Sequence, residues 1–308
     1  MILITGANGY IGQALTNKLH DLGIPCLPTD IRGLTNANVK MDELDVTDAK
    51  AWTRYLQAHK EIDTIVHLAA ESYIDRCEAN HQAALKTNVG SVIHMLNAAA
   101  DAGVQRIIFP SSFTVYGPDN VEIEESSQLH PKSLYAHMKV WAENLLDHAH
   151  ASSGLEVTIF RQSNICGVGP VAKPTVVQTL LTRWQAKKPI TIFGDGVQMR
   201  NFLDLRDCVN AYLLAIRQPV LGTFNLGGPS TLSIADLAKT INRMGQARCG
   251  YEVPIDFAEK KRQDIEPQAL SWTACGSKLE SSYGFQAKYT IEDTIEQMMT
   301  QMMGMDAQ

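Results

Sequence analysis

Short apolar runs alternate with longer amphipathic stretches through the first half of the chain. The short runs are rich in β-branched residues and have the length of strands. These predicted strands are Ile2–Thr5, Ile24–Asp30, Thr64–Ala69, Arg106–Ser111 and Glu156–Arg161. Apolar positions recur at helical spacing over Ile11–Leu22, Ala49–His59, Ala79–Ala102 and Tyr135–Ala151. This alternation predicts an α/β protein with a doubly wound parallel sheet that carries helices on both faces.

The pattern changes after Asn164, where glycine and proline become frequent. Two further helices are predicted at Asp207–Arg217 and Ile234–Met244, and they are expected to pack back on the sheet. We expect the chain to divide into a main domain and a smaller, loop-rich mixed α/β lobe at its C-terminal side. The main domain is expected to comprise residues 1–165 and a return segment at 203–226, and the smaller lobe residues 166–202 and 227–308.

Composition narrows the class of protein. The 308 residues are 45% hydrophobic and 19% charged, with a formal net charge of −6 and no basic block, so nucleic acid and anionic membranes are not expected as partners. No apolar run has the length of a transmembrane helix, and the first residues lack the layout of a signal peptide, so we expect a cytoplasmic protein. The six cysteines form no CxxC pair, which predicts reduced thiols and no metal site.

The first predicted strand runs directly into a glycine-rich turn, Gly6-Ala7-Asn8-Gly9-Tyr10-Ile11-Gly12, and a predicted helix follows. In such a turn the first glycine permits the tight bend, the second lets backbone approach a pyrophosphate, and the third lets the helix pack close to the strand. The helix N-terminus offers N–H groups and the positive end of its dipole to the phosphates. We therefore expect a dinucleotide to contact Gly6, Gly9, Tyr10, Ile11 and Gly12.

Two carboxylates after this turn bear on which dinucleotide binds. Asp30 ends the second predicted strand, where a carboxylate accepts hydrogen bonds from both ribose hydroxyls and repels a 2′-phosphate, so NAD is favoured over NADP. Arg32, two residues later, could instead pair with a 2′-phosphate. Asp45, followed by Val46, could hold the adenine amine, and a turn or cap role suits its position equally well.

Tyr135 and Lys139 stand at i and i+4 of a predicted helix and so share one face. A phenol with a pKa of about 10 is a poor base at neutral pH. A neighbouring ammonium and the positive charge of an oxidised nicotinamide both favour the phenolate and lower that pKa. Upstream, Ser112 follows a predicted strand and is expected at the carboxyl edge of the sheet, where ligands bind. This combination predicts a site at which a hydroxyl group can be oxidised.

With these motifs the sequence resembles the extended short-chain dehydrogenase/reductase family, the NAD-dependent nucleotide-sugar epimerases and dehydratases. The resemblance covers nearly the whole chain. The matching segments, in the family's order, are Gly6–Gly12, His67–Ala70, Thr87–Val89, Ser111–Gly117, Tyr135–Lys139, Arg161–Gly167, Gly194–Phe202 and Thr223–Gly228. The resemblance implies a Rossmann domain that binds NAD and a substrate-binding lobe that holds a nucleotide-diphosphate sugar.

The resemblance also implies roles for individual residues. Tyr135 is the catalytic base, Lys139 is its electrostatic partner and a ligand of the nicotinamide ribose, and Ser112 is the active-site hydroxyl. The implied cofactor contacts are Leu68, Ala69, Ala70 and Asn88. Asn164 and Arg200 are the implied contacts of the substrate diphosphate, a suitable task for a guanidinium fork.

Some positions keep two interpretations. Glu71 and Ser72 could touch sugar hydroxyls or cap the following helix. The family's Arg-x-x-Asp grip on the nucleotide is matched loosely by Lys260-Lys261-Arg262-Gln263-Asp264, so Arg262 is expected either to contact a phosphate or ribose or to belong to a solvated basic patch. His67 has apolar neighbours and is expected to be a satisfied core histidine rather than a catalytic one.

The two residues after Ser112 bear on the reaction. Dehydratases of this family carry an Asp-Glu pair there, whereas this chain has Phe113 and Thr114. We therefore expect an NAD-dependent epimerase that acts through a transient 4-keto intermediate. The segment His67–Arg76 resembles the dehydratase branch more closely, so a dehydratase or a nucleotide-ketosugar reductase stays an alternative. A catalytically silent NAD-binding regulatory subunit is a further one.

Two more features concern assembly and the C-terminal end. The helices Ala79–Ala102 and Tyr135–Ala151 each carry an alanine-rich face. In the family the equivalent pair forms a four-helix bundle between subunits, so the resemblance implies a homodimer. The methionine-rich segment from Met298 to Met305 predicts a terminal amphipathic helix that frays.

Overall fold

The computed structural model describes residues 1–31, 39–118, 123–171, 173–259 and 277–305. Its centre is a seven-stranded sheet in the order β3-β2-β1-β4-β5-β6-β10, in which all neighbouring strands are parallel. The strands are β1 (Ile2–Thr5), β2 (Cys26–Asp30), β3 (Asp42–Glu43), β4 (Thr64–His67), β5 (Arg106–Ser112), β6 (Glu156–Gln162) and β10 (Gly222–Leu226). All five strands predicted from the sequence lie in this sheet, so the predicted parallel sheet is confirmed.

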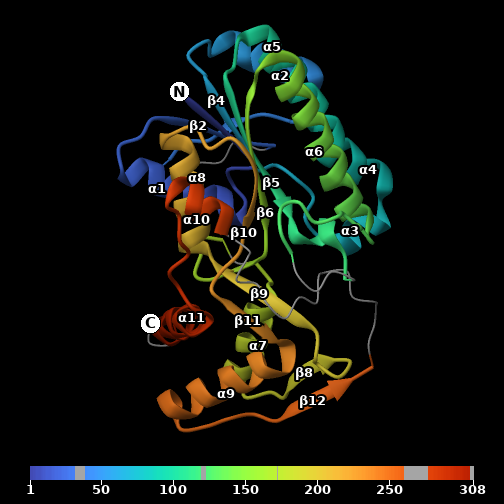
Figure 1. Cartoon of the computed structure of the whole chain (residues 1–308). Helices are drawn as coiled ribbons and strands as arrows, with labels where there is room; N and C mark the ends of the chain where they lie inside the picture. Colours follow the sequence, from blue (N-terminus) through green and yellow to red (C-terminus); the bar gives the residue numbers. More distant parts are fainter. Residues whose placement is uncertain (32–38, 119–122, 172, 260–276, 306–308) are drawn as a thin grey trace.

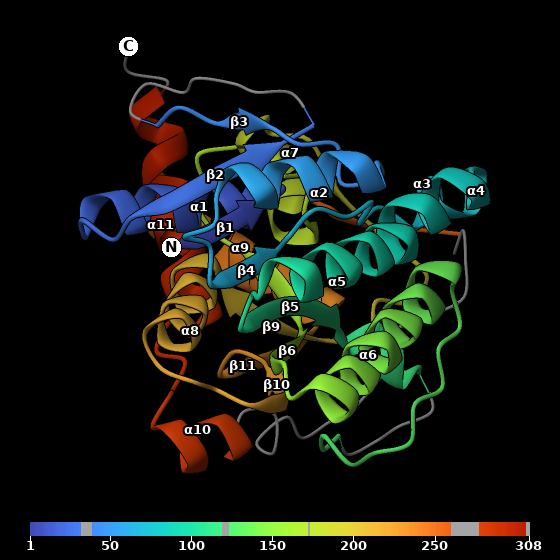
Figure 2. The ribbon, with the colours of Figure 1, turned by 90° about the horizontal axis from the view of Figure 1, so that it is seen from above.

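Helices cover both faces of this sheet (Figures 1 and 2). One face carries α2 (Ala49–Ala58), α5 (Ser91–Ala102) and α6 (Leu134–Ser153), and the other carries α1 (Tyr10–Asp21), α8 (Leu205–Arg217) and α10 (Ser277–Tyr283). Successive side chains of a strand point to opposite faces. In β1, Leu3 therefore packs in the core under α2 and α5, whereas Ile2 and Ile4 pack under α1 and α8. The doubly wound α/β fold is confirmed.

The predicted helix Ala79–Ala102 is broken into several pieces, and the prediction of one continuous helix is wrong. The pieces are α3 (Ile74–Ala79), α4 (His81–Leu85), a π-helical turn at Lys86–Gly90 and α5. Asn80 has φ −145° and ψ 81°, and its side chain accepts a hydrogen bond from Ala83 N, so it ends α3 and caps α4. The π-helical turn contains Asn88, whose buried side chain binds the backbone of Glu71. Single π-helical turns are frequent at functional sites.

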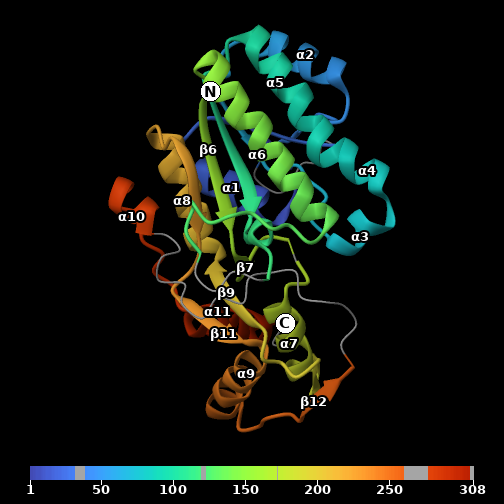
Figure 3. The same cartoon turned by 45° about the vertical axis from the view of Figure 1, so that its right-hand side comes forward.

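A smaller lobe lies beyond the carboxyl edge of the sheet (Figures 1 and 3). Its mixed sheet has the order β11-β9-β7, with β7 parallel and β11 antiparallel to β9. These strands are β7 (Asn164–Cys166), β9 (Met199–Asp204) and β11 (Ser230–Ser233), and β8 (Ile190–Phe193) pairs in parallel with β12 (Ile255–Ala258). The helices are α7 (Val176–Gln185), α9 (Ile234–Cys249) and α11 (Ile291–Met305). The predicted mixed α/β lobe is thus present.

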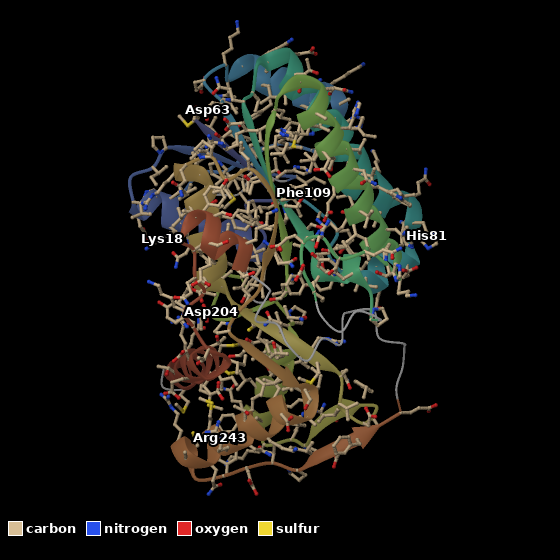
Figure 4. The ribbon with its side chains drawn as sticks, viewed as in Figure 1. Lys18, Asp63, His81, Phe109, Asp204 and Arg243 are labelled. Atoms are coloured by element: carbon tan, nitrogen blue, oxygen red, sulfur yellow. The ribbon has the colours of Figure 1, made fainter. Side chains whose placement is uncertain are left out.

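The chain passes between the two lobes more than once. After β9 it returns to the large sheet through α8, which packs on α1, and through β10, which pairs with β6. The expectation that the second late helix also packs on this sheet is wrong, because α9 packs against α7 in the smaller lobe. Asp204 lies at the junction of the lobes (Figure 4), where its side chain pairs with Arg206 and accepts a hydrogen bond from Thr294 of α11. These contacts tie the C-terminal helix to the start of α8.

The C-terminal helix is packed rather than frayed. Met298 and Met299 are 3% and 0% exposed and belong to the core of the smaller lobe, so the expectation of fraying is wrong for this part of α11. The apolar face of the helix is covered by α7 and α9, which gives it tertiary support. Among the described residues, none of the helices has the length and apolar character needed to cross a membrane.

Candidate active site

The glycine turn joins β1 to α1 at the carboxyl edge of the sheet, next to the end of β4. Strand order reverses between β1 and β4, and ligands of doubly wound folds bind in the crevice at this point. Gly6 has φ +65°, and a Cβ there would lie 2.6 Å from Ala69 N. A Cβ on Gly12 would overlap the carbonyl oxygen of Gly6 and lie 2.8 Å from Ala7 Cα. Only glycine therefore fits at these two positions.

The start of α1 is suited to an anion. Gly9 precedes the helix, no described side chain caps the first turn, and that turn contains no acidic residue. The N–H groups and the dipole at such an end favour a phosphate. The carboxylate of Asp30, at the end of β2, lies against the turn because its Oδ2 accepts a hydrogen bond from Asn8 N at 3.0 Å. A pyrophosphate cradle beside a carboxylate that can bind a ribose fits NAD.

Asp45 and Val46 lie in the loop after β3 and have local partners. Asp45 Oδ1 accepts hydrogen bonds from the backbone N and the Oγ1 of Thr47, at 2.8 and 2.7 Å. Val46 is 8% exposed and packs in the core. These contacts are those of a turn residue and its buried neighbour, and the predicted adenine contact of Asp45 stays a prediction.

A cavity of about 660 Å³ extends from the glycine turn into the smaller lobe. Its volume is in the range of small-molecule sites. The sequence-predicted residues that line it are Gly6, Gly9, Tyr10, Ile11, Gly12, Leu68, Ala70, Ser72, Ser112, Tyr135, Lys139, Asn164 and Arg200. The lining does not include Asp30, Asp45, Val46, Ala69, Glu71 or Asn88, and Arg262 lies outside the described residues.

Tyr135 and Lys139 are placed in this cavity by α6. Ser133 caps the helix by accepting a hydrogen bond from Ala136 N, so Tyr135 falls in the first turn and Lys139 one turn later. Lys139 is 3% exposed; its Nζ donates to the carbonyl of Pro110 in β5 at 2.6 Å and lies 5.7 Å from the centre of the Tyr135 ring. Burial lowers the pKa of Lys139 to about 8, and the nearby Glu143 carboxylate opposes this shift.

Ser112 is the last residue of β5. Of the two residues after it, Thr114 lines the cavity and Phe113 does not. Ser112 Oγ accepts hydrogen bonds from Thr114 N and Thr114 Oγ1, at 3.3 and 3.0 Å. Thr114 also lines the cavity, a contact that no sequence motif predicted. Phe113 is 3% exposed and packs edge-on against Tyr116, away from the lining. The position after the serine is therefore part of a core cluster rather than of the site.

His67 is buried at the end of β4, as expected for a core histidine. Its Nδ1 lies 2.8 Å from Thr5 Oγ1 and its Nε2 3.1 Å from Ser91 Oγ. Burial lowers the pKa of His67 to about 3, with a further contribution from the Lys139 ammonium, so the ring is neutral at physiological pH. Thr5 Oγ1 also accepts a hydrogen bond from Ala69 N, so this cluster orients the segment Leu68–Ala70 that follows β4.

The next segment is held from behind by Asn88. Its Oδ1 accepts from Glu71 N at 2.8 Å and its Nδ2 donates to Glu71 O at 2.9 Å. The Glu71 carboxylate accepts a hydrogen bond from Tyr73 N, just before α3, and lies 3.7 Å from an Arg76 nitrogen. Of the two residues with open interpretations, Glu71 is thus engaged at the helix start, whereas Ser72 lines the cavity.

The smaller lobe contributes the far wall of the cavity. Asn164 in β7 donates to the carbonyl of Asn201, and Arg200 in β9 donates to that of Met199 at 2.7 Å. Both residues line the cavity. Phe193 at the end of β8 lines the same wall and is 42% exposed.

The lysine in this wall, Lys173, and the contact of Tyr10 with the loop after β7 are not marked by any sequence motif. Lys173, in the loop before α7, lines the cavity and lies 6.0 Å from the centre of the Tyr10 ring. Burial lowers its pKa. Tyr10 donates a hydrogen bond to the carbonyl of Gly167 at 2.7 Å, and a Cβ on Gly169 would meet the Tyr10 ring. No periodic pattern marks a single lysine in a glycine- and proline-rich loop, so its position became visible only in the folded chain.

The charge of the cavity wall is one-sided. Its charged members, among the residues described, are the cations Lys139, Lys173 and Arg200, and no aspartate or glutamate lines it. Within the same described ranges, no group of three His, Cys, Asp or Glu side chains is arranged to hold a metal ion. The site is therefore suited to an anionic ligand.

Known proteins resemble this chain in both sequence and structure. A UDP-glucose 4-epimerase of Azospirillum brasilense is 27% identical over 295 residues, which cover 88% of this chain and 83% of the relative. The UDP-glucose 4-epimerase of Thermotoga maritima, solved with UDP-glucose, is 25% identical with a TM-score of 0.85, covering 98% and 99% of the two chains. A dTDP-glucose 4,6-dehydratase of Streptomyces venezuelae, solved with NAD, is 25% identical with a TM-score of 0.81, covering 96% of each chain.

These relatives include epimerases and a dehydratase, in agreement with the resemblance drawn from the motifs. The model of the NAD dependent epimerase/dehydratase family matches residues 2–227. This match contains the glycine turn, Ser112, the Tyr135–Lys139 pair and both lobes' contributions to the cavity up to Arg200. The chain therefore belongs to the NAD dependent epimerase/dehydratase family.

Proposed function

We propose that the protein is an NAD-dependent epimerase that inverts C4 of a nucleotide-diphosphate sugar through a transient 4-keto intermediate. One observation carries the proposal: the described wall of the cavity combines Ser112, Tyr135 and Lys139 with two further cations, and holds no carboxylate. The first three groups suit oxidation of a hydroxyl, and the cations suit a diphosphate. A 4-epimerisation needs no other acid or base, because the same hydride and proton leave and return.

The cofactor side of the proposal uses the glycine turn and the end of β4. Gly6, Gly9 and Gly12 with the start of α1 hold the pyrophosphate, and Asp30 binds the adenosine ribose. Leu68, Ala69 and Ala70, oriented by the Thr5–His67 cluster, line the cofactor, and Asn88 fixes the backbone that follows. When bound, NAD accepts a hydride from the sugar carbon and can return it.

Proton transfer is assigned to Tyr135. As the sugar C4 hydrogen leaves with its electron pair, the Tyr135 phenolate takes the proton of the C4 hydroxyl, which leaves a ketone. The Lys139 ammonium favours the phenolate and keeps this base available at neutral pH. Ser112 donates a hydrogen bond to the reacting oxygen. After the ketose rotates, the hydride returns to the opposite face and Tyr135 gives the proton back.

Substrate binding is assigned to the wall made by the smaller lobe. Arg200 and Lys173 provide two cations that face the cavity, and Asn164 adds a side-chain amide. A guanidinium fork and an ammonium suit the oxygens of a diphosphate. The sugar then extends toward Tyr135, and Ser72 is close enough to the cavity to meet a sugar hydroxyl.

A dehydratase is the less favoured assignment for this site. Elimination of water from a 4-ketose needs an acid and a base beside the sugar in addition to Tyr135. The positions that follow Ser112 hold a buried phenylalanine and a threonine, and neither side chain titrates near neutral pH. A reductase would need the same residues as an epimerase but would release oxidised cofactor, so only an assay separates these two.

The decisive experiment incubates the purified protein with NAD and UDP-, GDP-, CDP- and dTDP-sugars, and follows the products by NMR. We expect a C4 epimer with no net change in cofactor. A 4-keto-6-deoxy product would instead assign a dehydratase. A parallel incubation with NADH and a nucleotide-ketosugar that forms oxidised cofactor in stoichiometric amount would assign a reductase. Tyr135→Phe should lower kcat roughly a thousandfold, whereas Tyr251→Phe in the smaller lobe should leave it unchanged. A biological role untouched by Tyr135→Phe would support a silent regulatory subunit.

We also propose that the protein is a homodimer that pairs α5 and α6 with their copies in a four-helix bundle. Three large apolar side chains are exposed on this side of the molecule: Leu85 at 38%, Ile93 at 42% and Trp141 at 42%. They lie on neighbouring helices, α4, α5 and α6, and large exposed apolar side chains on adjacent elements favour an interface. Trp141→Asp should convert a dimer to a monomer in light scattering, whereas Phe257→Asp, at an exposed apolar residue of the smaller lobe, should not. A monomeric unsubstituted protein would refute this proposal.

The cysteines favour a reducing compartment, and we propose a cytoplasmic location. The five cysteines within the described residues are all free, and Cys77, Cys166 and Cys208 are buried. Structural disulfides are typical of oxidising compartments. Fractionation of the source cells, with the protein detected by antibody, tests the location, and recovery outside the cytoplasmic fraction would contradict it.

A further inference from the structure

Two side chains of α6, Lys139 and Glu143, bind the carboxyl end of β5. Tyr135, Lys139 and Glu143 are spaced by four residues and so form one stripe along the helix. Lys139 Nζ donates to the carbonyl of Pro110, and Glu143 accepts a hydrogen bond from the hydroxyl of Ser111. Successive residues of the strand are thus held by successive turns of the helix, and the next residue of the strand is Ser112.

Glu143 is also the centre of a buried ion pair that the proposed mechanism does not use. It is 3% exposed, and Arg161 of β6 donates to it through Nε at 3.1 and 3.2 Å and through Nη2 at 2.7 Å. The remaining nitrogen of Arg161, Nη1, donates to Tyr116 Oη at 2.9 Å and to the carbonyl of Glu125 at 3.0 Å. The guanidinium orientation is therefore fixed on every side.

Stability alone does not account for this pair. A buried ion pair loses the hydration of both charges, and apolar residues of the same volume often stabilise a protein as well or better. The pair is nevertheless placed directly behind the reacting groups. Glu143 lies one helical turn after Lys139, and its carboxylate holds the residue before Ser112.

We propose that Glu143 is a positioning residue of the active site, which holds the Ser112 end of β5 in register with Tyr135 and keeps the Lys139 ammonium charged. This inference rests on the proposed roles of Tyr135, Lys139 and Ser112. Glu143 acts through these groups and does not line the cavity itself. Arg161 is its counter-charge, which limits the field of the carboxylate at the reacting groups.

The electrostatic part of the argument follows from what surrounds Lys139. Burial lowers its pKa to about 8, and the Glu143 carboxylate is the largest influence in the opposite direction. The other titratable groups that act on Lys139 or Glu143 from the packed elements are Cys77 of α3, Lys173 before α7, His67 of β4, Arg161 of β6 and Asp147 of α6. Removing the carboxylate leaves these groups in place and adds one net positive charge.

The test removes the charge of Glu143, the charge of Arg161, and both charges together. The pH profile of kcat is measured for each variant. Glu143→Gln makes the site more positive, so the pKa values of Tyr135 and Lys139 should both fall and the whole profile should move to lower pH. A charge one helical turn away at an effective dielectric of about 20 predicts a shift of roughly two pH units. Arg161→Gln should move the profile in the opposite direction. The double variant Glu143→Gln/Arg161→Gln should return it close to the original position.

A matched control lies at the other end of the same strands. Arg106 of β5 pairs with Glu156 of β6 at 2.8 Å, at the amino ends of these strands and away from the cavity. Glu156→Gln should leave the pH profile unmoved. Ser111→Ala removes a hydrogen bond but no charge, so it should lower kcat a few-fold without a shift in pH. Profiles that do not move in folded Glu143→Gln, or that move the same way in both single variants, would overturn the proposal.

Two further measurements keep the test decisive. If a single variant fails to fold, as judged by circular dichroism, the double variant restores charge balance, and the proposal requires its pH profile to match the original. The phenolate absorbance of Tyr135, obtained by subtracting Tyr135→Phe, can be titrated in the NAD-loaded protein without a sugar. If no sugar is turned over, the proposed function fails, yet a phenolate titration that moves down in Glu143→Gln still supports this inference, and one that stays fixed refutes it.

Discussion

The two halves of the cavity are built by different means. The half beside β1 and β4 is shaped by backbone, since Gly6 and Gly12 leave no room for a Cβ. The segment after β4 is held through its main-chain groups, which bind the carbonyl and hydroxyl of Thr5 and the side chain of Asn88. The half in the smaller lobe is shaped by side chains, of which Lys173 and Arg200 carry the charge. A backbone cradle accepts one ligand geometry, whereas a wall of side chains can change its ligand by substitution. The first half therefore suits a constant cofactor and the second a variable substrate.

Tyr10 contacts both halves of the cavity. Tyr10 belongs to the glycine turn, yet its hydroxyl binds the carbonyl of Gly167 and its ring packs against Gly169 in the loop of the other half. The comparison between the halves can thus be tested by substitutions in each half and at this link.

The largest effect on ligand binding is expected when a side chain is added to the half that is shaped by backbone. In Gly12→Ala the added methyl would overlap the Gly6 carbonyl, and the turn must shift. Overpacking of this kind costs about 1–3 kcal/mol in stability, and we expect the affinity for NAD to fall at least roughly a hundredfold, since the cradle depends on its geometry. Calorimetry with NAD measures this. Gly304→Ala, where nothing lies within 4 Å of the added methyl, is the control and should bind NAD normally.

A substitution in the half built by side chains is expected to have a smaller effect, which is confined to the binding of the nucleotide sugar. Arg200→Gln removes a cation from the wall without changing the glycine turn. A charged hydrogen bond contributes about 1.5–3 kcal/mol, so KM for the nucleotide sugar should rise roughly ten- to a hundredfold while the Kd of NAD stays constant. Arg217→Gln, at the exposed end of α8, should change neither constant. A matching loss of NAD affinity in Arg200→Gln would show that the halves are not independent.

The dependence of kcat on pH tests the role of Lys139, which lies where the two halves of the cavity meet. Burial lowers the pKa of this ammonium to about 8, so the charge that favours the Tyr135 phenolate is present below that pH and is lost above it. We expect kcat to fall roughly tenfold per pH unit on the alkaline side. Lys139→Arg keeps a charge at all accessible pH values, and its alkaline limb should disappear even if its maximal rate is lower. A limb that persists in Lys139→Arg would assign it to another group.

The smallest effect is expected from the link between the halves. Tyr10→Phe removes one buried hydrogen bond, worth about 1 kcal/mol. Because the bond joins the glycine turn to the substrate loop, we expect increases of roughly three- to fivefold in both the Kd of NAD and the KM of the sugar. Tyr55→Phe, which loses a bond to Asp42 outside the cavity, should lower the melting temperature similarly and leave both constants unchanged. A change in only one constant would place Tyr10 in one half alone.

Much of the fold and of the cofactor half was predictable because its signals are local. The strands of the large sheet are short β-branched runs, and the glycine turn, Asp30 and the Tyr135–Lys139 pair each depend on spacing within one or two elements. The continuous helix predicted over Ala79–Ala102 failed for two reasons. Asn80 leaves the helical conformation and caps α4 through Ala83 N. The π-helical turn contains Asn88, whose side chain binds the backbone of Glu71, a residue outside that window.

By itself, the sequence determined the parallel sheet, the position of the glycine turn at its carboxyl edge, and the family to which the chain belongs. Periodicity and motif spacing carry this information because each involves residues close together in the chain. Only the tertiary structure placed Lys173 in the cavity, buried Phe113 away from it, and joined Glu143 to Ser111 and Arg161 behind Lys139. Those residues lie on separate elements, and their proximity depends on how the helices pack on the sheet, which no local pattern records.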